Sequence, residues 1–323
     1  MDRKTRNGIL CARFRKEEEP EVRHQRLHAL AHLFYILPGM KRVVRVLVRL
    51  AIQHFPLSMM NRQRLYNFFA LDTVPEKTVQ CHTSVPEGMS VSLQLPLQDD
   101  LSRKWYYWGY TGYEQGTTRL FCQLLQSKSC VFDVGANIGY YTILAAAFLQ
   151  GRGEVHAFEP WPHAFSWLSR NVNRNRLTCV YLNQLALSDR TGQASLFLPV
   201  DGAWSNASLV EGFTKQLEAL TVVTSRFDSY CQLHQLHAVD LIKIDVEGAE
   251  LQVLQGMGSL LRQLSPDIIC EVLAPFDQQL ETWLAQYGYR KFLITDTGLD
   301  EVETITAHPR FRDYYLSHAP VFY

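Results

Sequence analysis

Short apolar runs alternate with helical stretches along most of the chain beyond residue 80. Buried strands are predicted by the apolar runs at 130–134, 154–160, 179–187, 239–248 and 266–273, with 289–295 and 319–323 as a last pair and 89–98 as a hairpin strand. Helices are predicted at 118–126, 140–150 and 163–175. Strands that alternate with helices build a mostly parallel sheet with helices on both faces. We therefore expect one α/β domain over residues 80–323.

Residues 1–79 follow a different pattern, which predicts a basic helical extension. Residues 22–36 and 41–55 have helical periodicity, and residues 1–65 hold 14 Lys and Arg against 5 Asp and Glu. In the second helix, one face is predicted to carry Arg42, Arg45 and Arg49, and the opposite face Val44, Leu47, Val48 and Ala51. Such a helix docks on the catalytic domain or on a second copy of the chain, or lies on an anionic membrane surface. The sequence leaves these interpretations open.

The composition indicates an ordinary globular protein, with 47% hydrophobic and 20% charged residues. The seven cysteines include no CxxC pair, which argues against a disulfide framework or a zinc ribbon and favours the reducing cytoplasm. We expect no signal peptide and no transmembrane helix, because the apolar runs are too short or are interrupted by arginine. Nucleic-acid binding is not expected, since the core domain is acidic. The expected location is the cytoplasm, with contact to the inner face of the membrane left open.

The stretch DVGANIG at 133–139 predicts a cofactor-binding turn. It follows an apolar strand and precedes a helix, so free backbone N–H groups would meet a ligand at the carboxyl edge of the sheet. Glu159 ends the next strand, where the ribose hydroxyls of a nucleoside would lie. Asn137 replaces the glycine that a pyrophosphate requires, and Asp133 would repel a phosphate but attract an ammonium group. A ribose, a positive charge and no diphosphate describe S-adenosylmethionine.

Five segments, taken in order, resemble the FkbM family of S-adenosylmethionine-dependent methyltransferases: FDVGANIGYYT, FEP, NVNRN, ALSDRTG and LIKIDVEGAELQVLQG. The resemblance covers roughly residues 105–323. It implies a class I (Rossmann-like) methyltransferase fold, whose seven-stranded sheet has a final antiparallel strand. It also implies methylation of a hydroxyl on a sugar, glycolipid or secondary-metabolite acceptor, and it suggests that Glu114 belongs to a lid or entry segment. Nothing about residues 1–79 carries over from the family.

The cofactor contacts are expected at the turn and at two strand ends. The methionine part of S-adenosylmethionine is expected against Asp133, Gly135, Ala136, Asn137 and Gly139. Glu159 is expected to accept hydrogen bonds from the ribose hydroxyls. The turn at 185–188, which includes Ala186 and Leu187, is expected to border the adenine.

The apolar strand at 239–248 carries the candidate catalytic groups. Lys243 and Asp245 point to the same face, because side chains alternate along a strand. A lysine in a central strand needs a charged partner, which Asp245 or Glu271 can supply, for a structural or a catalytic purpose. We expect Asp245 to act as the general base that takes the proton of the acceptor hydroxyl, with Lys243 or Glu271 tuning it.

Other polar groups leave alternatives open. His156 and His163 are weaker candidates for the base. Three carboxylates end strands at one crevice: Asp245, Glu247 and Glu271. Together they could hold a divalent metal, but the sequence assigns no metal ligand. Glu250 is expected to cap the following helix. Asn171 and Asn175 lie one helical turn apart and are either contacts between elements or ligand groups.

The polar segment 201–218, with Trp204 in its middle, is either an acceptor-binding loop or an ordinary surface insertion. The leading function is an O-methyltransferase acting on a small-molecule or glycan acceptor. A nicotinamide-dependent sugar oxidoreductase is disfavoured by Asn137 and Asp133. A non-catalytic S-adenosylmethionine-binding scaffold is disfavoured because Asp133, Glu159 and Asp245 are intact.

Overall fold

The computed structural model of the chain describes residues 40–54, 59–70, 79–84, 90–97, 99–109, 114–199, 207–210 and 217–319. The helix predicted over 22–36 lies outside these ranges. The chain divides into two compact units, Met1–Thr73 and Val74–Tyr323, close to the expected boundary between residues 79 and 80.

The described part of the first unit consists of α2 (Met40–His54) and α3 (Met59–Ala70). The two faces predicted for α2 are wrong in part. Arg45 is buried together with Val48 and Ile52, whereas Leu47 is 59% exposed. The helix thus buries a stripe that includes the whole side chain of an arginine. Among the described helices, none has the length and hydropathy needed to cross a membrane.

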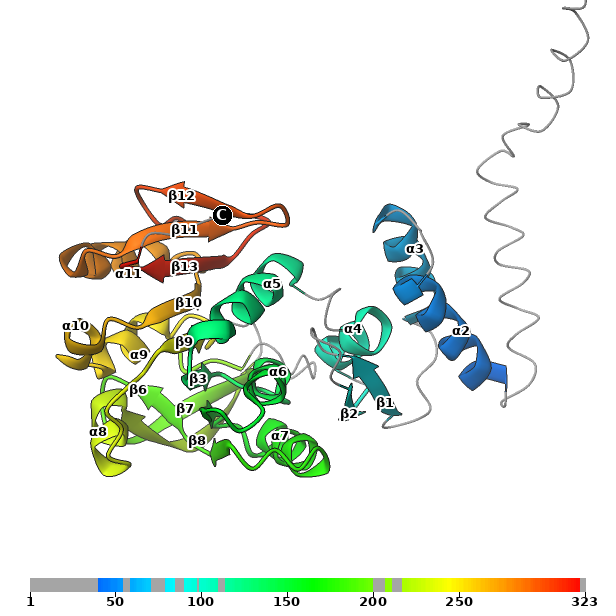
Figure 1. Cartoon of the computed structure of the whole chain (residues 1–323), viewed down its shortest axis with the longest axis horizontal. Coiled ribbons are helices and arrows are strands. Elements are labelled where there is room, and N and C mark those ends of the chain that lie inside the picture. Colours follow the sequence, from blue (N-terminus) through cyan, green and yellow to red (C-terminus); the bar gives the residue numbers. More distant parts are fainter. Residues whose placement is uncertain are drawn as a thin grey trace, which may run out of the picture. The chain divides into compact units, whose positions relative to one another are not determined.

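The second unit is built on an eight-stranded sheet (Figure 1). In spatial order its strands are β12 (Leu299–Val302), β11 (Arg290–Ile294), β13 (Asp313–Ser317), β10 (Asp267–Glu271), β9 (Leu241–Ile244), β3 (Cys130–Val134), β4 (Glu154–Phe158) and β5 (Val180–Asn183). The five strands from β10 to β5 are parallel, and β13 is inserted antiparallel between β10 and β11. The predicted class I fold, with its final strand antiparallel, is confirmed, and β12 adds an edge strand.

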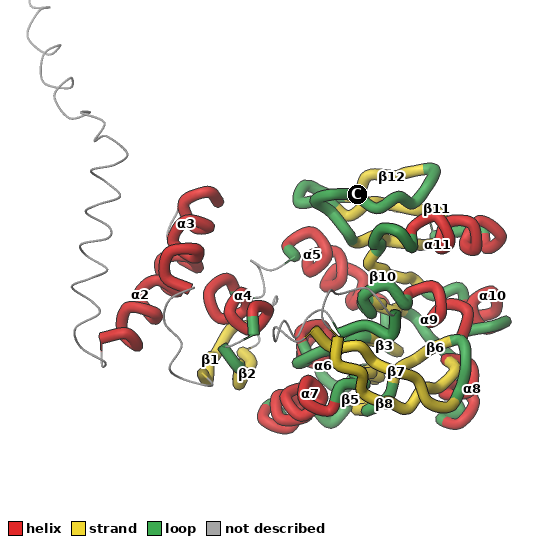
Figure 2. The backbone as a smooth tube through the Cα atoms, turned by 180° about the vertical axis from the view of Figure 1, so that it is seen from behind, coloured by secondary structure: helices red, strands yellow, loops and turns green. Residues whose placement is uncertain are grey.

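Helices cover both faces of this sheet (Figures 1 and 2). One face carries α5 (Gln115–Leu124), the short η2 (Leu125–Ser127), α6 (Tyr140–Leu149) and α7 (Pro162–Arg174). The other face carries α8 (Phe227–Leu233), α9 (Glu250–Gly256), α10 (Leu260–Leu264), α11 (Asp277–Leu284) and η4 (Ala285–Tyr287). Phe132 and Ile244 from the sheet pack with Phe227 and Leu254 in the core of this second face.

Two strand predictions are wrong. The run at 179–187 is two strands, because only β5 joins the main sheet, while β6 (Ala186–Ser188) pairs with β8 (Leu217–Arg226) in a separate sheet. That sheet is completed by β7 (Gly192–Pro199), which pairs antiparallel with β8. The strand that pairs with β11 on its inner side is β13 and not the predicted 319–323, because alternate side chains of β13, such as Leu316, fill the core between β10 and β11. Residues 320–323 lie outside the described ranges.

A small hairpin and one more helix precede the main sheet. The hairpin pairs β1 (Val79–Ser84) with β2 (Ser90–Leu95), and α4 (Asp100–Trp108) follows. Asn171 of α7 and Asn175, the residue that follows its last turn, bind the backbone of β2: Asn175 Oδ1 accepts from Ser92 N at 2.7 Å, and Asn171 Oδ1 accepts from Gln94 N at 2.8 Å. Asn171 and Asn175 are therefore contacts between elements, which resolves the alternative that the sequence left open.

Candidate active site

The turn between β3 and α6 is held tightly against neighbouring strands. The N–H groups of Gly135 and Ala136 both donate to Phe158 O, at 3.0 and 2.9 Å. Gly135 has φ +86°, and a Cβ at this position would lie 1.8 Å from Asp245 O. Only glycine fits both the left-handed conformation and the close approach of β9. The turn is thus fixed between the ends of β4 and β9.

Glu159 links this turn to the end of β4. Its Oε2 accepts from Asn137 N at 2.8 Å, and its Oε1 accepts from Trp161 N at 2.9 Å. Burial raises the pKa of Glu159 to about 7, against the lowering effect of these two hydrogen bonds. Each carboxylate oxygen keeps a further lone pair, so ribose hydroxyls can be bound here as well.

Two pockets meet at the turn. A narrow one is lined by Phe158, Glu159, Pro160, Leu185, Ala186 and Leu187. A wide one, of about 650 Å³, extends towards β10, β11 and β13. The two pockets share Gly135, Asn137, Asp245 and Glu247. The predicted adenine turn and the predicted ribose carboxylate therefore lie in one pocket, next to a larger cavity.

Asp133 and Asn137 present polar atoms to the cavity. Asp133 is almost fully buried, and burial raises its pKa to about 6, although Thr142 donates a hydrogen bond to it. The buried Oδ1 of Asn137 has no hydrogen-bond partner among the described residues. Both groups can accept hydrogen bonds from an ammonium group, and a buried acceptor without a partner calls for such a donor.

Lys243 lies at the centre of a buried charge cluster. Its Nζ is 3.1 Å from Asp245 Oδ2 and 3.4 Å from Asp313 Oδ1, and it lies 5.3 Å from the ring centre of Tyr141. Burial alone would lower the pKa of Lys243, but the surrounding carboxylates outweigh it and raise that pKa well above its usual value. Lys243 is therefore a paired cation, as the sequence predicted.

Carboxylates crowd the strand ends beside Lys243. Oxygens of Asp245, Glu247 and Glu271 lie within 4.8 Å of one another, a spacing at which a cation could be held. Burial, with the charge of Asp245, raises the pKa of Glu247 to about 8 and that of Glu271 to about 11. Glu271 Oε1 is 3.5 Å from Arg312 Nη1. The carboxyl end of the sheet is thus acidic where it borders the cavity.

Two further cavity-lining carboxylates complete the cluster. Asp313, from β13, was missed because its strand was predicted six residues too late. Glu114 precedes α5 and accepts a 2.6 Å hydrogen bond from the hydroxyl of Tyr141. Burial, with the charge of Asp313, raises the pKa of Glu114 to about 7. An acid in an alternating Tyr-rich strand, such as Asp313, is a weak signal in a single sequence, whereas the family resemblance had suggested Glu114 as part of a lid or entry segment.

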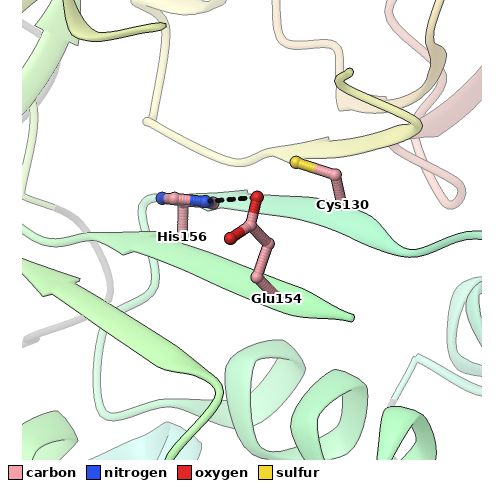
Figure 3. Close-up of side chains that lie close together, drawn as sticks. All are labelled: Cys130, Glu154 and His156. Carbon is pink, nitrogen blue, oxygen red and sulfur yellow. Dashed lines mark ion pairs between the residues drawn. The ribbon is translucent and has the colours of Figure 1, made fainter. Parts of the chain in front are cut away.

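The two histidines considered as alternative bases lie away from the pockets, and Glu250 lies at the start of a helix. Neither His156 nor His163 lines the pockets, and His156 lies with Cys130 and Glu154 at the amino ends of β3 and β4 (Figure 3). Glu250 was expected to cap α9, but Ala249 is the N-cap and makes no side-chain hydrogen bond; Glu250 Oε1 instead accepts from Gly248 N at 3.0 Å in the turn before the helix.

Of the segment 201–218, residues 207–210 and 217–218 are described, and the first of these stretches reaches the site. Ser208 Oγ donates to Glu247 O at 2.6 Å, and Ala207 and Leu209 line the narrow pocket. Trp204 lies outside the described residues, so its stacking role stays a prediction.

Comparison with known proteins gives a consistent result. The model of the methyltransferase FkbM domain family matches residues 133–291. The hexuronic acid methyltransferase AglP of Haloferax volcanii is 29% identical over 189 residues, which cover 58% of this chain and 74% of AglP. The 31-O-demethyl-FK506 methyltransferase FkbM of Streptomyces tacrolimicus is 30% identical over 167 residues, covering 41% of this chain and 61% of that protein. The 2-O-methyltransferase NoeI of Sinorhizobium fredii is 30% identical over 142 residues, covering 39% and 56%.

Solved structures include a crystal structure of a methyltransferase FkbM from Methylobacillus flagellatus KT. It is 16% identical, with a TM-score of 0.38, and the match covers 58% of this chain and 43% of that one. The METTL16 methyltransferase domain has a TM-score of 0.40 at 14% identity, over 70% of this chain and 72% of the other. Both likenesses are distant, and the fold assignment rests on the strand order given above.

Proposed function

The chain belongs to the FkbM family of S-adenosylmethionine-dependent methyltransferases, and we propose that it methylates a hydroxyl oxygen of a sugar-containing acceptor. The observation that carries this proposal is the pair of adjoining pockets. The narrow pocket and the turn suit the cofactor, and the wide cavity beside them has room for a sugar.

The residues at the turn fit S-adenosylmethionine. Glu159 has free lone pairs for the ribose hydroxyls, and Leu185 and Leu187 supply apolar walls for the adenine. Asp133 and the unpartnered Oδ1 of Asn137 would receive the ammonium group and offset the positive charge of the cofactor. A Cβ at Gly135 would clash with Asp245 O, so glycine lets the cofactor turn pack directly against the end of β9.

The lining of the wide cavity favours a polyhydroxylated acceptor. Charged and hydrogen-bonding side chains lie around it, including Lys104, Glu114, Thr117, Asp296, Arg310 and Asp313. Sugar hydroxyls both donate and accept hydrogen bonds, so they match a wall of this kind. Two of the similar proteins carry names that point to sugar or 2-O-methylation, which supports the same class of acceptor.

In this proposal Asp245 is the general base. When bound, S-adenosylmethionine supplies an electrophilic methyl group on a positively charged sulfur, which leaves as a neutral thioether. Asp245 lies at the junction of both pockets, where it can take the proton as the acceptor oxygen forms its new bond to carbon. Lys243, fixed by Asp313, holds the Asp245 carboxylate in position.

The proposal is tested by incubating the protein with methyl-labelled S-adenosylmethionine and a panel of sugars, uronic acids and oligosaccharides. We expect label in an acceptor, as an alkali-stable methyl ether. Asp245→Asn is expected to lower kcat by about 100-fold or more with cofactor binding retained. Label on nitrogen or carbon, or full activity in Asp245→Asn, would contradict the proposal. Asp300→Asn, on the edge strand β12, is the matched control and is expected to keep full activity.

A further inference from the structure

Three potential metal ligands meet at the amino ends of β3 and β4, at the edge of the sheet opposite the methyl-transfer cavity. Cys130 and Glu154 are direct neighbours in the parallel register, and His156 follows two residues later on the same face as Glu154. One ligand atom from each lies within 4.8 Å of the others. Figure 3 shows the three side chains turned towards one another. None of them lines either pocket of the candidate active site.

The ring of His156 is fixed in a way that leaves one nitrogen available. Its Nδ1 hydrogen-bonds the hydroxyl of Tyr230 at 2.8 Å, and Tyr230 is held in turn by Asn183. Its Nε2 has no hydrogen-bond partner among the described residues, although His156 is only 1% exposed. A histidine that binds a metal through one nitrogen is commonly oriented through the other.

The spacing of the nearest pair is informative. His156 Nε2 lies 3.5 Å from Glu154 Oε1, too far for a good hydrogen bond. Two such ligands around a tetrahedral zinc ion, at about 2.0–2.1 Å each, are separated by about 3.4 Å. The observed separation, which is also that of a histidine–carboxylate ion pair, is therefore close to the one that a tetrahedral zinc ion between the two atoms requires.

The donor set also selects the kind of ion. A thiol, an imidazole and a carboxylate are the groups that bind Zn²⁺, whereas Mg²⁺ and Ca²⁺ prefer oxygen alone. Cys130 is buried and makes no disulfide. The Glu154 side chain is 35% exposed, so the cluster has an opening through which an ion can enter and a water can complete the coordination.

We propose that Cys130, Glu154 and His156 form a binding site for a thiophilic divalent cation, Zn²⁺, which ties the amino ends of β3 and β4 together. The site is separate from the cofactor pocket, and the proposal does not depend on the reaction the protein catalyses.

The test is a titration of the full-length, chelator-treated protein with Co²⁺ as a coloured substitute for zinc. We expect a thiolate-to-cobalt charge-transfer band that saturates at one equivalent and disappears when Zn²⁺ is added. Cys130→Ser is expected to lose this band, and Glu154→Gln and His156→Gln are expected to weaken Co²⁺ binding by about tenfold or more. Cys122→Ser, a buried cysteine on α5, is the matched control and should keep the band.

The variants are checked for folding by circular dichroism and by S-adenosylmethionine binding, which is expected to be unchanged. No charge-transfer band in the wild type, or a band that survives in Cys130→Ser, overturns the proposal. If Cys130→Ser does not fold, the Co²⁺ affinity of Glu154→Gln tests the site instead, because this side chain is partly exposed and its substitution disturbs the fold less. An unchanged Co²⁺ affinity in that variant also overturns the site.

Discussion

Lys243 Nζ lies 3.1 Å from Asp245 Oδ2, and Lys243 has no exposed surface. The pair connects the buried side of the central strand β9 to the point where the two pockets meet. Asp313, from the last strand of the sheet, lies on the other side of the same ammonium group. A single buried cation therefore connects the β9 end, the inserted strand β13 and the candidate base.

Lys243→Met is expected to destabilise the protein strongly. The substitution leaves Asp313, whose side chain is 11% exposed, and the partly exposed Asp245 without their cation, which costs about 3 kcal/mol in the free energy of unfolding. Arg290→Met is the control, because its partner Glu301 is exposed and such pairs contribute at most about 1 kcal/mol. Urea denaturation measures both values. Equal, small losses in the two variants would contradict a central role for the buried pair.

Gly135→Ala is expected to abolish cofactor binding and to destabilise the fold by about 3 kcal/mol or more. The new Cβ would lie 1.8 Å from Asp245 O, at a residue with φ +86°. Gly151→Ala is the matched control, since Gly151 has φ +79° but no atom within 4 Å of the added Cβ. It is expected to cost only the left-handed strain, about 1–2 kcal/mol, and to bind S-adenosylmethionine normally. Equal effects at both positions would mean that the close approach to β9 is unimportant.

Buried carboxyl groups give the ligand-free protein a predictable pH dependence. The pKa of Glu159 rises from its ordinary 4.5 to about 7 on folding, mainly through burial. Between these two values the folded state holds more protons than the unfolded chain, so this group makes stability fall as the pH rises. We expect Glu159→Gln to flatten the decline of the melting temperature with pH over this window.

The pH experiment has a clear contrary outcome. Glu301→Gln removes an exposed carboxyl whose pKa is lowered by Arg290, so it should not flatten the decline. Burial of Glu159 predicts that the melting temperature of the wild type falls relative to that of Glu159→Gln as the pH rises from about 5 to about 7. A relative rise of the wild-type melting temperature over this range would contradict it.

Exposed apolar side chains on α2 identify the residues through which the expected membrane contact would be made. Val43, Val46, Leu47 and Leu50 follow helical spacing and are all exposed. On an anionic membrane surface such a stripe enters the interface, and Arg49, which is partly exposed, lies close enough to meet the headgroups. We expect the full-length protein to sediment with vesicles that contain anionic lipid, and the double variant Leu47→Glu, Leu50→Glu to lose this binding.

The control for that experiment is Val223→Glu, an exposed apolar position on β8 in the second unit. It should bind vesicles as the wild type does. Binding that is equal for neutral and anionic vesicles, or that is unaffected by the double variant, would leave the membrane expectation without support.

The local parts of this site could be predicted from the sequence. The turn at 133–139 and Glu159 depend on residues close together in the chain. The structure places Gly135 and Asn137 beside Glu159 in the narrow pocket and Asp133 and Ala136 at the wide cavity, whereas Gly139 lines neither. Lys243 was predictable as a paired cation because burying an unpaired charge in a central strand is too costly.

The rest depends on contacts between distant segments. Asp313 reaches Lys243 only because β13 is inserted between β10 and β11, a pairing that no local pattern fixes. The same holds for β6, whose three residues leave the main sheet to pair with β8. The exposed face of α2 also differed from the expectation, because Arg45 shares the buried face with Val48, which was expected on the opposite face, and Leu47 is exposed.

Calorimetric titration with S-adenosylmethionine, and separately with NAD and NADP, tests the central claim most directly. We expect the wild type to bind S-adenosylmethionine with micromolar affinity and to bind neither nicotinamide cofactor. Glu159→Ala should weaken that binding by about tenfold or more, because the ribose loses its carboxylate partner. Binding of NAD or NADP instead, or equal binding of S-adenosylmethionine by both forms, would contradict the assignment of the turn and of Glu159.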